Sequence, residues 1–303
     1  MKILVPGASG LVGAAVCHAA ARAGHTVVGW HGRNRPPSVA GAAFSQVDLT
    51  DAKAVETAAA EADAEVIVNC AALSQPAICE REPELSRRLN VTLPAVLARL
   101  AETSGCRLLH LSSEQVFSGE TDRPYRPDDA VAPRNVYGRH KVESEQRVFD
   151  RAGSLATVIR PPLMAGNSGE GTRSPHEQML AAWRAGQTPK AFVDEFRQPC
   201  SADNLAAVLV ELCSRLDCDG LFHWGGRELI SRYDLLVAFR RRFGLSESAA
   251  PIARQTRAEV PDVARLRPRT LPLDVSALAA RIQTKVETLD DLLGTLRWTT
   301  PAE

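Results

Sequence analysis

Three side chains that can move or hold a proton follow one another in the middle of this 303-residue chain. Ser113 closes an apolar run, and Tyr137 and Lys141 stand at the start of a helical pattern. Residues four apart on a helix lie one above the other, which places the lysine ammonium beside the phenol. A phenol has an unperturbed pKa of about 10, and a neighbouring ammonium favours the phenolate. The set therefore predicts a tyrosine that exchanges a proton with a carbonyl or alcohol oxygen, which the serine hydroxyl holds in place.

A tyrosine and a lysine at this spacing also occur by chance in many helices, so the hypothesis depends on a hydride source nearby. Near the N-terminus, Gly7, Gly10 and Gly13 follow a short apolar run and open an alanine-rich helix. Gly7 permits a tight turn, Gly10 lets the backbone approach a pyrophosphate, and Gly13 lets the helix pack closely on the strand. A second strand over 26–30 completes the opening of a doubly wound, parallel α/β sheet that binds a dinucleotide.

The residues expected to bind the dinucleotide lie in this turn and at the carboxyl ends of later strands, where parallel α/β sheets bind ligands. They are Gly7, Ser9, Gly10, Leu11, Val12, Gly13, Arg33, Asp48, Leu49, Cys70, Ala71, Ala72, Arg160 and Pro161. Asp48 and Leu49 stand where an adenine could be contacted. The small residues from Cys70 to Ala72 would let a cofactor cross the strand end, although small residues also simply pack tightly.

The end of the second strand bears on the choice of cofactor. It reads Trp30-His31-Gly32-Arg33-Asn34-Arg35, with no carboxylate to bind the 2′-hydroxyl of the adenosine ribose. An arginine there can pair with a 2′-phosphate, which favours NADP(H) over NAD(H). The alternative is that Arg33 and Arg35 lie on a solvated loop, because two prolines follow.

Composition excludes several other classes of function. Lys plus Arg equals Asp plus Glu at 36 each, so no net charge argues for nucleic acid or an anionic membrane as a partner. The seven cysteines form no CxxC pair and no Cys/His ligand spacing, which argues against a metal site and fits a reducing compartment. No stretch of 18 apolar residues exists, so we expect a soluble cytoplasmic protein without a membrane partner.

The remaining pattern alternates strands and helices. Further strands are expected over 44–47, 65–69, 106–111, 155–160 and 221–224, and helices over 51–62, 82–103, 136–151, 174–185, 201–216 and 231–243. Asn90, inside the second of these helices, would either face solvent or be buried with a structural partner. Residues 246–272 are expected to be irregular. We expect 1–162 and 190–216 to form the dinucleotide-binding Rossmann domain, and 163–189 and 217–303 a smaller mixed α/β substrate-binding domain.

Taken together, these motifs resemble the extended short-chain dehydrogenase/reductases and, within them, the dTDP-4-dehydrorhamnose reductase group. The resemblance rests on the glycine spacing over 7–13, on Asn69-Cys-Ala-Ala72, on His110-Leu-Ser-Ser-Glu-Gln-Val-Phe117 and on Tyr137-Gly-x-x-Lys141, in the order that the family shows. Later segments such as Gln198-Pro199 also have counterparts, so the resemblance covers nearly the whole chain.

The resemblance implies a role for each residue of the set described first. Ser113 takes the place of the family's catalytic threonine or serine and orients the carbonyl, and Tyr137 is the proton donor. Lys141 holds the nicotinamide ribose and lowers the pKa of Tyr137, so both residues also bind the cofactor. The substrate is expected to contact a further set of residues, namely Leu73, Glu114, Gln115 and Pro162.

We therefore expect an NADPH-dependent reductase of a keto group, on a nucleotide-activated keto-sugar or a related small molecule. Glu114-Gln115 replace the Asp-Tyr that is usual in the group, which leaves the sugar open; a homodimer is also left open. An NAD(P)-dependent sugar-nucleotide epimerase or dehydratase would use the same three residues with an added acid or base, for which Glu114 is available. A non-catalytic NADP-binding regulatory subunit is the other alternative, because the β-subunit of methionine adenosyltransferase resembles the same group.

Overall fold

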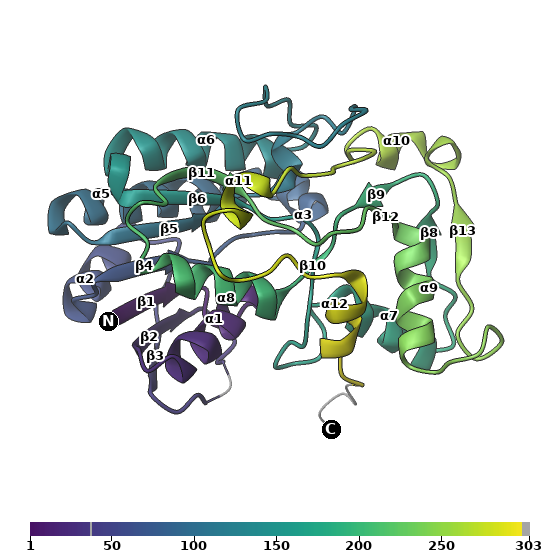
Figure 1. Ribbon diagram of the computed structural model, residues 1–303, viewed down its shortest axis with the longest axis horizontal. Helices are drawn as coiled ribbons and strands as arrows, with labels where there is room; N and C mark the ends of the chain where they lie inside the picture. The colour runs from purple at the N-terminus through teal and green to yellow at the C-terminus, as the bar shows by residue number, and fades with distance from the viewer. Residues whose placement is uncertain (37, 299–303) are drawn as a thin grey trace.

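The computed structural model describes residues 1–36 and 38–298. Its main element is a seven-stranded sheet in which every strand runs parallel to its neighbours. In spatial order the strands are β3 (Ala42–Gln46), β2 (Thr26–His31), β1 (Lys2–Pro6), β4 (Val66–Asn69), β5 (Arg107–Leu111), β6 (Ala156–Arg160) and β11 (Gly220–His223). The strand order reverses between β1 and β4, so the predicted doubly wound α/β fold is confirmed (Figure 1).

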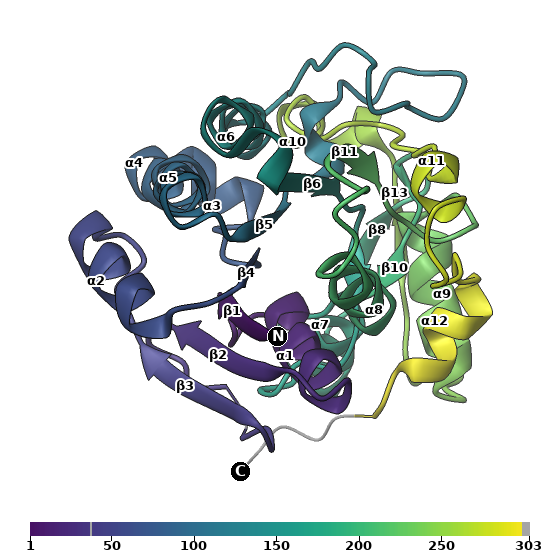
Figure 2. The same ribbon diagram turned by 60° about the vertical axis from the view of Figure 1, so that its left-hand side comes forward.

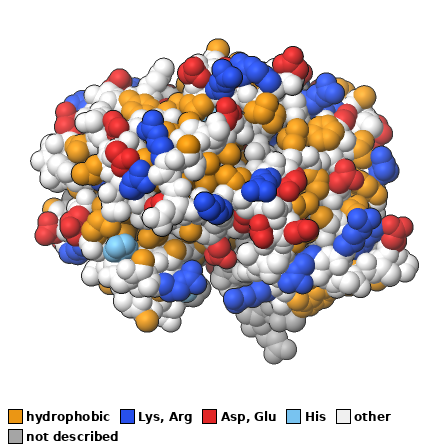
Figure 3. Space-filling model, in the orientation of Figure 1, with side chains coloured by type: hydrophobic (Ala, Val, Ile, Leu, Met, Phe, Trp, Pro, Cys, Tyr) orange, Lys and Arg blue, Asp and Glu red, His pale blue; other side chains and the backbone are white. Residues whose placement is uncertain are grey.

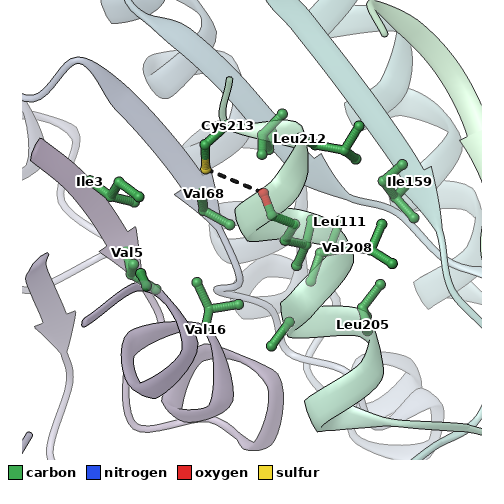
Figure 4. Packing of buried hydrophobic residues seen from close by; sticks show 14 of the residues in the cluster. Ile3, Val5, Val16, Val68, Leu111, Ile159, Leu205, Val208, Leu212 and Cys213 are labelled. Carbon is green, nitrogen blue, oxygen red and sulfur yellow. Dashed lines mark hydrogen bonds between the residues drawn. The ribbon is translucent and has the colours of Figure 1, made fainter. Parts of the chain in front are cut away.

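Helices cover both faces of this sheet (Figure 2). One face carries α1 (Leu11–Arg22) and α8 (Ala202–Leu212), and the other carries α2 (Ala52–Ala62), α5 (Leu93–Ser104) and α6 (Val136–Ala152). On the first face, strand and helix side chains form one apolar cluster (Figure 4), which includes Ile3, Val5, Val16, Val68, Leu111, Leu205 and Val208. Because the central strands are covered on both faces, their sequences read as continuous hydrophobic runs.

The expected elements largely have the predicted type, with one informative exception. Asp51 caps α2 as predicted, since its carboxylate accepts a 2.9 Å hydrogen bond from the backbone N–H of Lys53. The single helix expected over 82–103 is instead interrupted. A short helix, α4 (Pro83–Arg87), leads into a π-helical turn, η1 (Arg88–Thr92), before α5 begins. Asn90 lies in this turn, and such insertions occur frequently at functional sites.

Beyond β6, the chain builds a smaller unit with its own apolar core (right-hand side of Figure 1). Its main elements are α7 (Pro175–Arg184), β8 (Lys190–Phe192), α9 (Arg232–Arg242), β13 (Ala253–Gln255) and α12 (Leu289–Thr295). The other described elements are short: α3 (Pro76–Arg81), η2 (Glu114–Val116), η3 (Gly153–Leu155), β7 (Met164–Ala165), β9 (Phe196–Arg197), β10 (Cys200–Ser201), β12 (Ile230–Ser231), η4 (Arg257–Glu259), α10 (Pro261–Ala264) and α11 (Ser276–Ala279).

Two strands pair within a different domain from the one to which the expected division assigns them. The division assigns β11 to the substrate-binding domain, but β11 pairs with β6 and extends the large sheet, where Phe222 joins the main core. It assigns β8 to the Rossmann domain, but β8 pairs with β13, inside the segment expected to be irregular. These pairings join segments that are far apart in sequence, which local patterns cannot show. The functional division into two domains stays a prediction.

The face of the molecule shown in Figure 3 carries no dominant charge. Lys, Arg, Asp and Glu side chains are interspersed over the face shown in Figure 3, and neither sign forms one broad field there. This agrees with the equal numbers of basic and acidic residues in the chain. Within residues 1–36 and 38–298, no helix has the length and apolar character needed to span a membrane.

Candidate active site

The glycine turn after β1 is tightly enclosed. Gly7 has a φ of +84°, which L side chains rarely adopt, and a Cβ added to it would lie 2.6 Å from the backbone nitrogen of Ala71. The backbone N–H groups of Gly7 and Ala8 donate to the carbonyl of Trp30 at 3.0 and 2.9 Å, which ties the turn to β2. A residue with a side chain at position 7 would therefore push β1 away from the end of β4.

The N-terminus of α1 fits a pyrophosphate. Gly10 is its N-cap and has no side chain to bind the first N–H groups of the helix. Leu11, Val12 and Gly13 supply those donors at the positive end of the helix dipole. Ser9 is half-buried in the turn beside them. The backbone thus presents uncapped donors to an anion, as a dinucleotide-binding turn requires.

The other expected cofactor residues lie along the same edge of the sheet, with different exposure. Arg33 is exposed beyond β2, and Asp48 is exposed beyond β3. The Asp48 carboxylate accepts from the hydroxyl and the N–H of Thr50 at 2.7 and 2.9 Å, which lowers its pKa. Leu49 packs against the core under α2 and α5. After β4, Cys70 is half-buried, Ala71 is buried under the glycine turn and Ala72 is exposed.

Ser113, Tyr137 and Lys141 come together where β5 ends against the first turns of α6. The side chain of Ser113 interacts with Tyr137 and favours a lower pKa of its phenol, and the Ser113 oxygen accepts a hydrogen bond from the N–H of Gln115 at 3.2 Å. The ammonium of Lys141 lies 5.9 Å from the centre of the Tyr137 ring. All three side chains are almost completely buried.

Local sequence explains how α6 reaches this position. Asn135 is its N-cap and accepts a 2.8 Å hydrogen bond from the N–H of Gly138. A Cβ added to Gly138 would collide with the backbone carbonyl of Gln115 and lie 2.8 Å from Cβ of Pro133. The absence of a side chain at this position therefore lets the helix approach the strand end closely enough for Tyr137 to reach Ser113.

Burial has the largest effect on the electrostatics of this set. Burial raises the pKa of Tyr137, and the neighbouring Ser113 side chain opposes this rise only in part. Burial also lowers the pKa of Lys141 to about 8, against the attraction of Glu145. The net pKa of Tyr137 is therefore raised, because removing water from the phenol has the largest effect, and a lowering by Lys141 stays a prediction. Lys141 directs its ammonium to the carbonyl of Leu111, at 2.7 Å.

Arg160 was expected at the cofactor, but its side chain is bound elsewhere. It is 3% exposed and forms a two-point ion pair with Glu145, at 2.8 and 2.7 Å. A third hydrogen bond, of 3.1 Å, goes to the carbonyl of Pro127 in the loop before α6. Glu145 also accepts from the hydroxyl of Ser112. The guanidinium thus fixes elements around the site, and a cofactor contact by this residue stays a prediction, as it does for the buried Pro161.

Two of the expected substrate residues, Glu114 and Gln115, contact neighbouring side chains. Glu114 is buried, and its Oε1 lies 3.3 Å from Nε of Arg197, while Oε2 has no hydrogen-bond partner among the described residues. Burial raises the pKa of Glu114 to about 8, although Arg197 opposes the shift. Gln115 accepts a 3.0 Å hydrogen bond from Asn135, so it supports α6. Pro162 follows β6 and lies near Gly225, which follows β11.

Leu73 is held by Asn90, a residue whose role the sequence left open. The Asn90 side chain accepts from the N–H of Leu73 and donates to its carbonyl, both at 3.0 Å, and is fully buried. It is therefore the buried polar group with a structural partner. Sequence reasoning also missed Glu145 and Arg197. Glu145 continues the four-residue spacing of Tyr137 and Lys141, whereas nothing near Arg197 in sequence points to Glu114.

The parallel sheet, the enclosed glycine turn and the motifs around β5 and α6 define the chain as an extended short-chain dehydrogenase/reductase in fold and sequence. More narrowly, the family described as "RmlD substrate binding domain" matches residues 1–298, and the chain belongs to this family.

Curated relatives carry different names. The chain is 32% identical over 284 residues to methionine adenosyltransferase 2 subunit beta of Pongo abelii, covering 91% of this chain and 81% of that protein. It is 30% identical over 298 residues to the "Probable low-salt glycan biosynthesis reductase Agl14" of Haloferax volcanii, covering 98% and 97%. The crystal structure of a dTDP-4-dehydrorhamnose reductase from Clostridium acetobutylicum superimposes with a TM-score of 0.82 at 24% identity, covering 97% of each chain. Because the identity to the Clostridium acetobutylicum protein is only 24%, this similarity shows a shared fold alone.

Proposed function

We propose that the protein is an NADPH-dependent reductase of a keto group on a nucleotide-activated sugar. The observation that carries the proposal is the grouping of the buried Ser113, Tyr137 and Lys141 side chains, with the lysine ammonium 5.9 Å from the centre of the tyrosine ring. This set stands on the same sheet edge as the glycine turn, whose uncapped helix N-terminus fits a dinucleotide pyrophosphate. Oxidoreductase chemistry needs both parts in one cleft.

Each side chain has one task in this reaction. The bound nicotinamide supplies the hydride. The Ser113 hydroxyl donates a hydrogen bond to the substrate carbonyl oxygen, and the Tyr137 phenol donates its proton to that oxygen as negative charge develops there. Because burial raises the pKa of Tyr137, the phenol is protonated at neutral pH and ready to act as the acid. The Lys141 ammonium lies near enough to stabilise the phenolate that remains.

Less specific features support the proposed substrate class and the proposed cofactor. Two relatives of this chain are named as a probable glycan biosynthesis reductase and as a dTDP-4-dehydrorhamnose reductase, which supports a sugar nucleotide as substrate. The exposed Arg33 after β2 is available for a 2′-phosphate, which supports NADP(H). Glu114 and Gln115 stand in place of the Asp-Tyr pair, which leaves the identity of the sugar open.

The test is an NADPH-consumption screen with the purified protein. The panel contains 4-keto sugars linked to dTDP, UDP or GDP, and simple ketones of similar size. We expect saturable oxidation of NADPH with at least one sugar nucleotide and none with the simple ketones. Turnover of ketones alone would contradict the proposed substrate class, and no turnover with any member would contradict the enzymatic proposal.

A regulatory function is the second candidate, because the chain is 32% identical to a methionine adenosyltransferase subunit over most of its length. The two proposals are separated by mixing the protein with a methionine adenosyltransferase catalytic subunit. A regulatory subunit would co-elute with it and change its kinetics, and Tyr137→Phe would leave this effect intact. A reductase would do neither, and Tyr137→Phe would remove its own NADPH turnover.

A further inference from the structure

The loop over 166–173, between β7 and α7, contacts two parts of the expected cofactor site that are far apart in sequence. At its start, a Cβ added to Gly166 would lie 3.5 Å from Cδ1 of Leu11, at the N-terminus of α1. Near its tip, Oε1 of Glu170 accepts a 2.7 Å hydrogen bond from Nδ2 of Asn34, in the segment after β2. The loop therefore extends from the pyrophosphate turn to the edge where the ribose 2′-position of a dinucleotide would lie.

A buried carboxylate gives this loop a defined conformation. Glu177, in the first turn of α7, is 1% exposed and accepts hydrogen bonds from the backbone N–H groups of Ser168, Arg173 and Ser174, at 2.7, 2.9 and 2.9 Å. It accepts a further bond from the Ser168 hydroxyl at 2.6 Å. Because both ends of the loop are held by one group, Glu170 is presented to Asn34 in a fixed direction.

Glu170 brings a carboxylate to an edge whose own segment contains none. Residues 32–36 after β2 read Gly-Arg-Asn-Arg-Pro, and the arginines on either side of Asn34 are exposed. Glu170 forms an ion pair with Arg173, whose Nε lies 3.8 Å from Oε2, and both side chains are more than one third exposed. Such an exposed pair is weak, so it leaves the charge of Glu170 largely available to a ligand.

We propose that Glu170 sets the preference of this protein between NAD(H) and NADP(H). A carboxylate at this edge can accept a hydrogen bond from a ribose 2′-hydroxyl and repels a 2′-phosphate, whereas Arg33 attracts the phosphate. The relative affinity for the two cofactors then depends on a cation, Arg33, at the end of β2 and on an anion, Glu170. Glu170 lies 136 positions beyond Asn34 in the chain. The inference rests on the proposed function only in requiring that a dinucleotide binds at the glycine turn.

The experiment measures binding of NADP⁺ and NAD⁺ by calorimetry, so it does not depend on knowing the substrate. The variants are Glu170→Gln, which removes the charge but retains a polar side chain, and Asn34→Ala, which removes its partner. The matched control is Glu102→Gln on α5, since Glu102 is similarly exposed and pairs with Arg151 at 3.6 Å, away from the sheet edge. Thermal unfolding of each variant checks that the fold is retained.

We expect Glu170→Gln to raise the affinity for NADP⁺ relative to NAD⁺ by about five-fold, the size expected for one charge at a partly exposed site. Glu102→Gln should leave the ratio unchanged, and Asn34→Ala should change it less than Glu170→Gln. An unchanged ratio in Glu170→Gln, or an equal change in both affinities, would overturn the proposal while leaving the reductase function standing. If the unaltered protein bound neither dinucleotide, both this inference and the proposed function would be wrong.

Discussion

The ammonium of Lys141 donates a 2.7 Å hydrogen bond to the backbone carbonyl of Leu111, the last residue of β5. This bond joins the helix that carries Tyr137 to the strand that leads into Ser113. Lys141 is 1% exposed, so the bond forms away from water, where an unpaired ammonium would be costly. The lysine therefore positions the two hydroxyl-bearing residues relative to each other in addition to placing a positive charge near the phenol.

Tyr137→Phe should remove catalysis and leave cofactor binding intact. Loss of a general acid reduces kcat by about 10²- to 10⁴-fold, and Phe preserves the packing of the buried ring. The measurement is kcat with the substrate found in the screen, together with the Kd for NADPH. Ser113→Ala is the companion variant and should also reduce kcat. Retained turnover in Tyr137→Phe would show that another group donates the proton.

The activity should fall as the pH rises through about 8. Burial lowers the pKa of Lys141 to about 8, so the ammonium is present at neutral pH and is lost above this value. Lys141→Arg keeps its charge and should lose this alkaline limb, although its rate will be lower because the shape differs. In the unaltered protein, kcat/KM that stays constant through pH 8 would contradict a role for the charge. The same shift makes folding more favourable as the pH rises from 8 to 10.5, because the unfolded chain then binds the extra proton.

Removing one partner of the buried ion pair between Glu145 and Arg160 should lower the free energy of unfolding. Glu145→Gln leaves a buried guanidinium without its carboxylate, and breaking a buried pair typically lowers the free energy of unfolding by about 3 to 5 kcal/mol. Replacing both residues, by Glu145→Leu with Arg160→Met, should restore part of this loss because no buried charge remains unpaired. Urea denaturation checks both variants. Equal losses in the single and double variants would show that the pair is not the source.

Glu114 should make stability fall as the pH rises towards 8. Burial raises its pKa to about 8 from 4.5, so the folded state keeps a proton that the unfolded chain releases. This contribution is complete below pH 4.5 and is lost as the pH rises through 8. Glu114→Gln stays neutral, so between these two pH values its unfolding free energy should improve relative to the unaltered protein by at least about 1 kcal/mol. Glu102→Gln serves as the control and should track the unaltered protein.

Glu114→Gln also bears on the remaining enzymatic alternative. A simple reductase needs only the proton of Tyr137, so it should retain measurable turnover of its keto substrate in this variant. An epimerase or dehydratase that used Glu114 as the added acid or base would lose activity by orders of magnitude. Product analysis by mass spectrometry separates the two, because reduction adds two hydrogens, dehydration removes water, and epimerisation leaves the mass unchanged.

Local sequence determined the elements and the set of chemical groups. Backbone conformation and helix geometry act over a few residues. They therefore connect the glycine spacing over 7–13, the buried strands and the Tyr137–Lys141 spacing directly to local structure. The fold class, the Asp51 cap and the order of the site motifs were therefore predictable. The π-helical turn at Asn90 was not predicted, and neither were the two hydrogen bonds of Asn90 to Leu73, which lies 17 positions away in the chain.

Only the tertiary structure decided what each charged group contacts. It pairs Arg160 with Glu145 and Arg197 with Glu114, adds β11 to the large sheet, and brings Glu170 to Asn34. It also determines that burial raises the pKa of Tyr137. These outcomes depend on distance and on exclusion of water between segments that are remote in the chain, and neither is encoded in the spacing of residues along it.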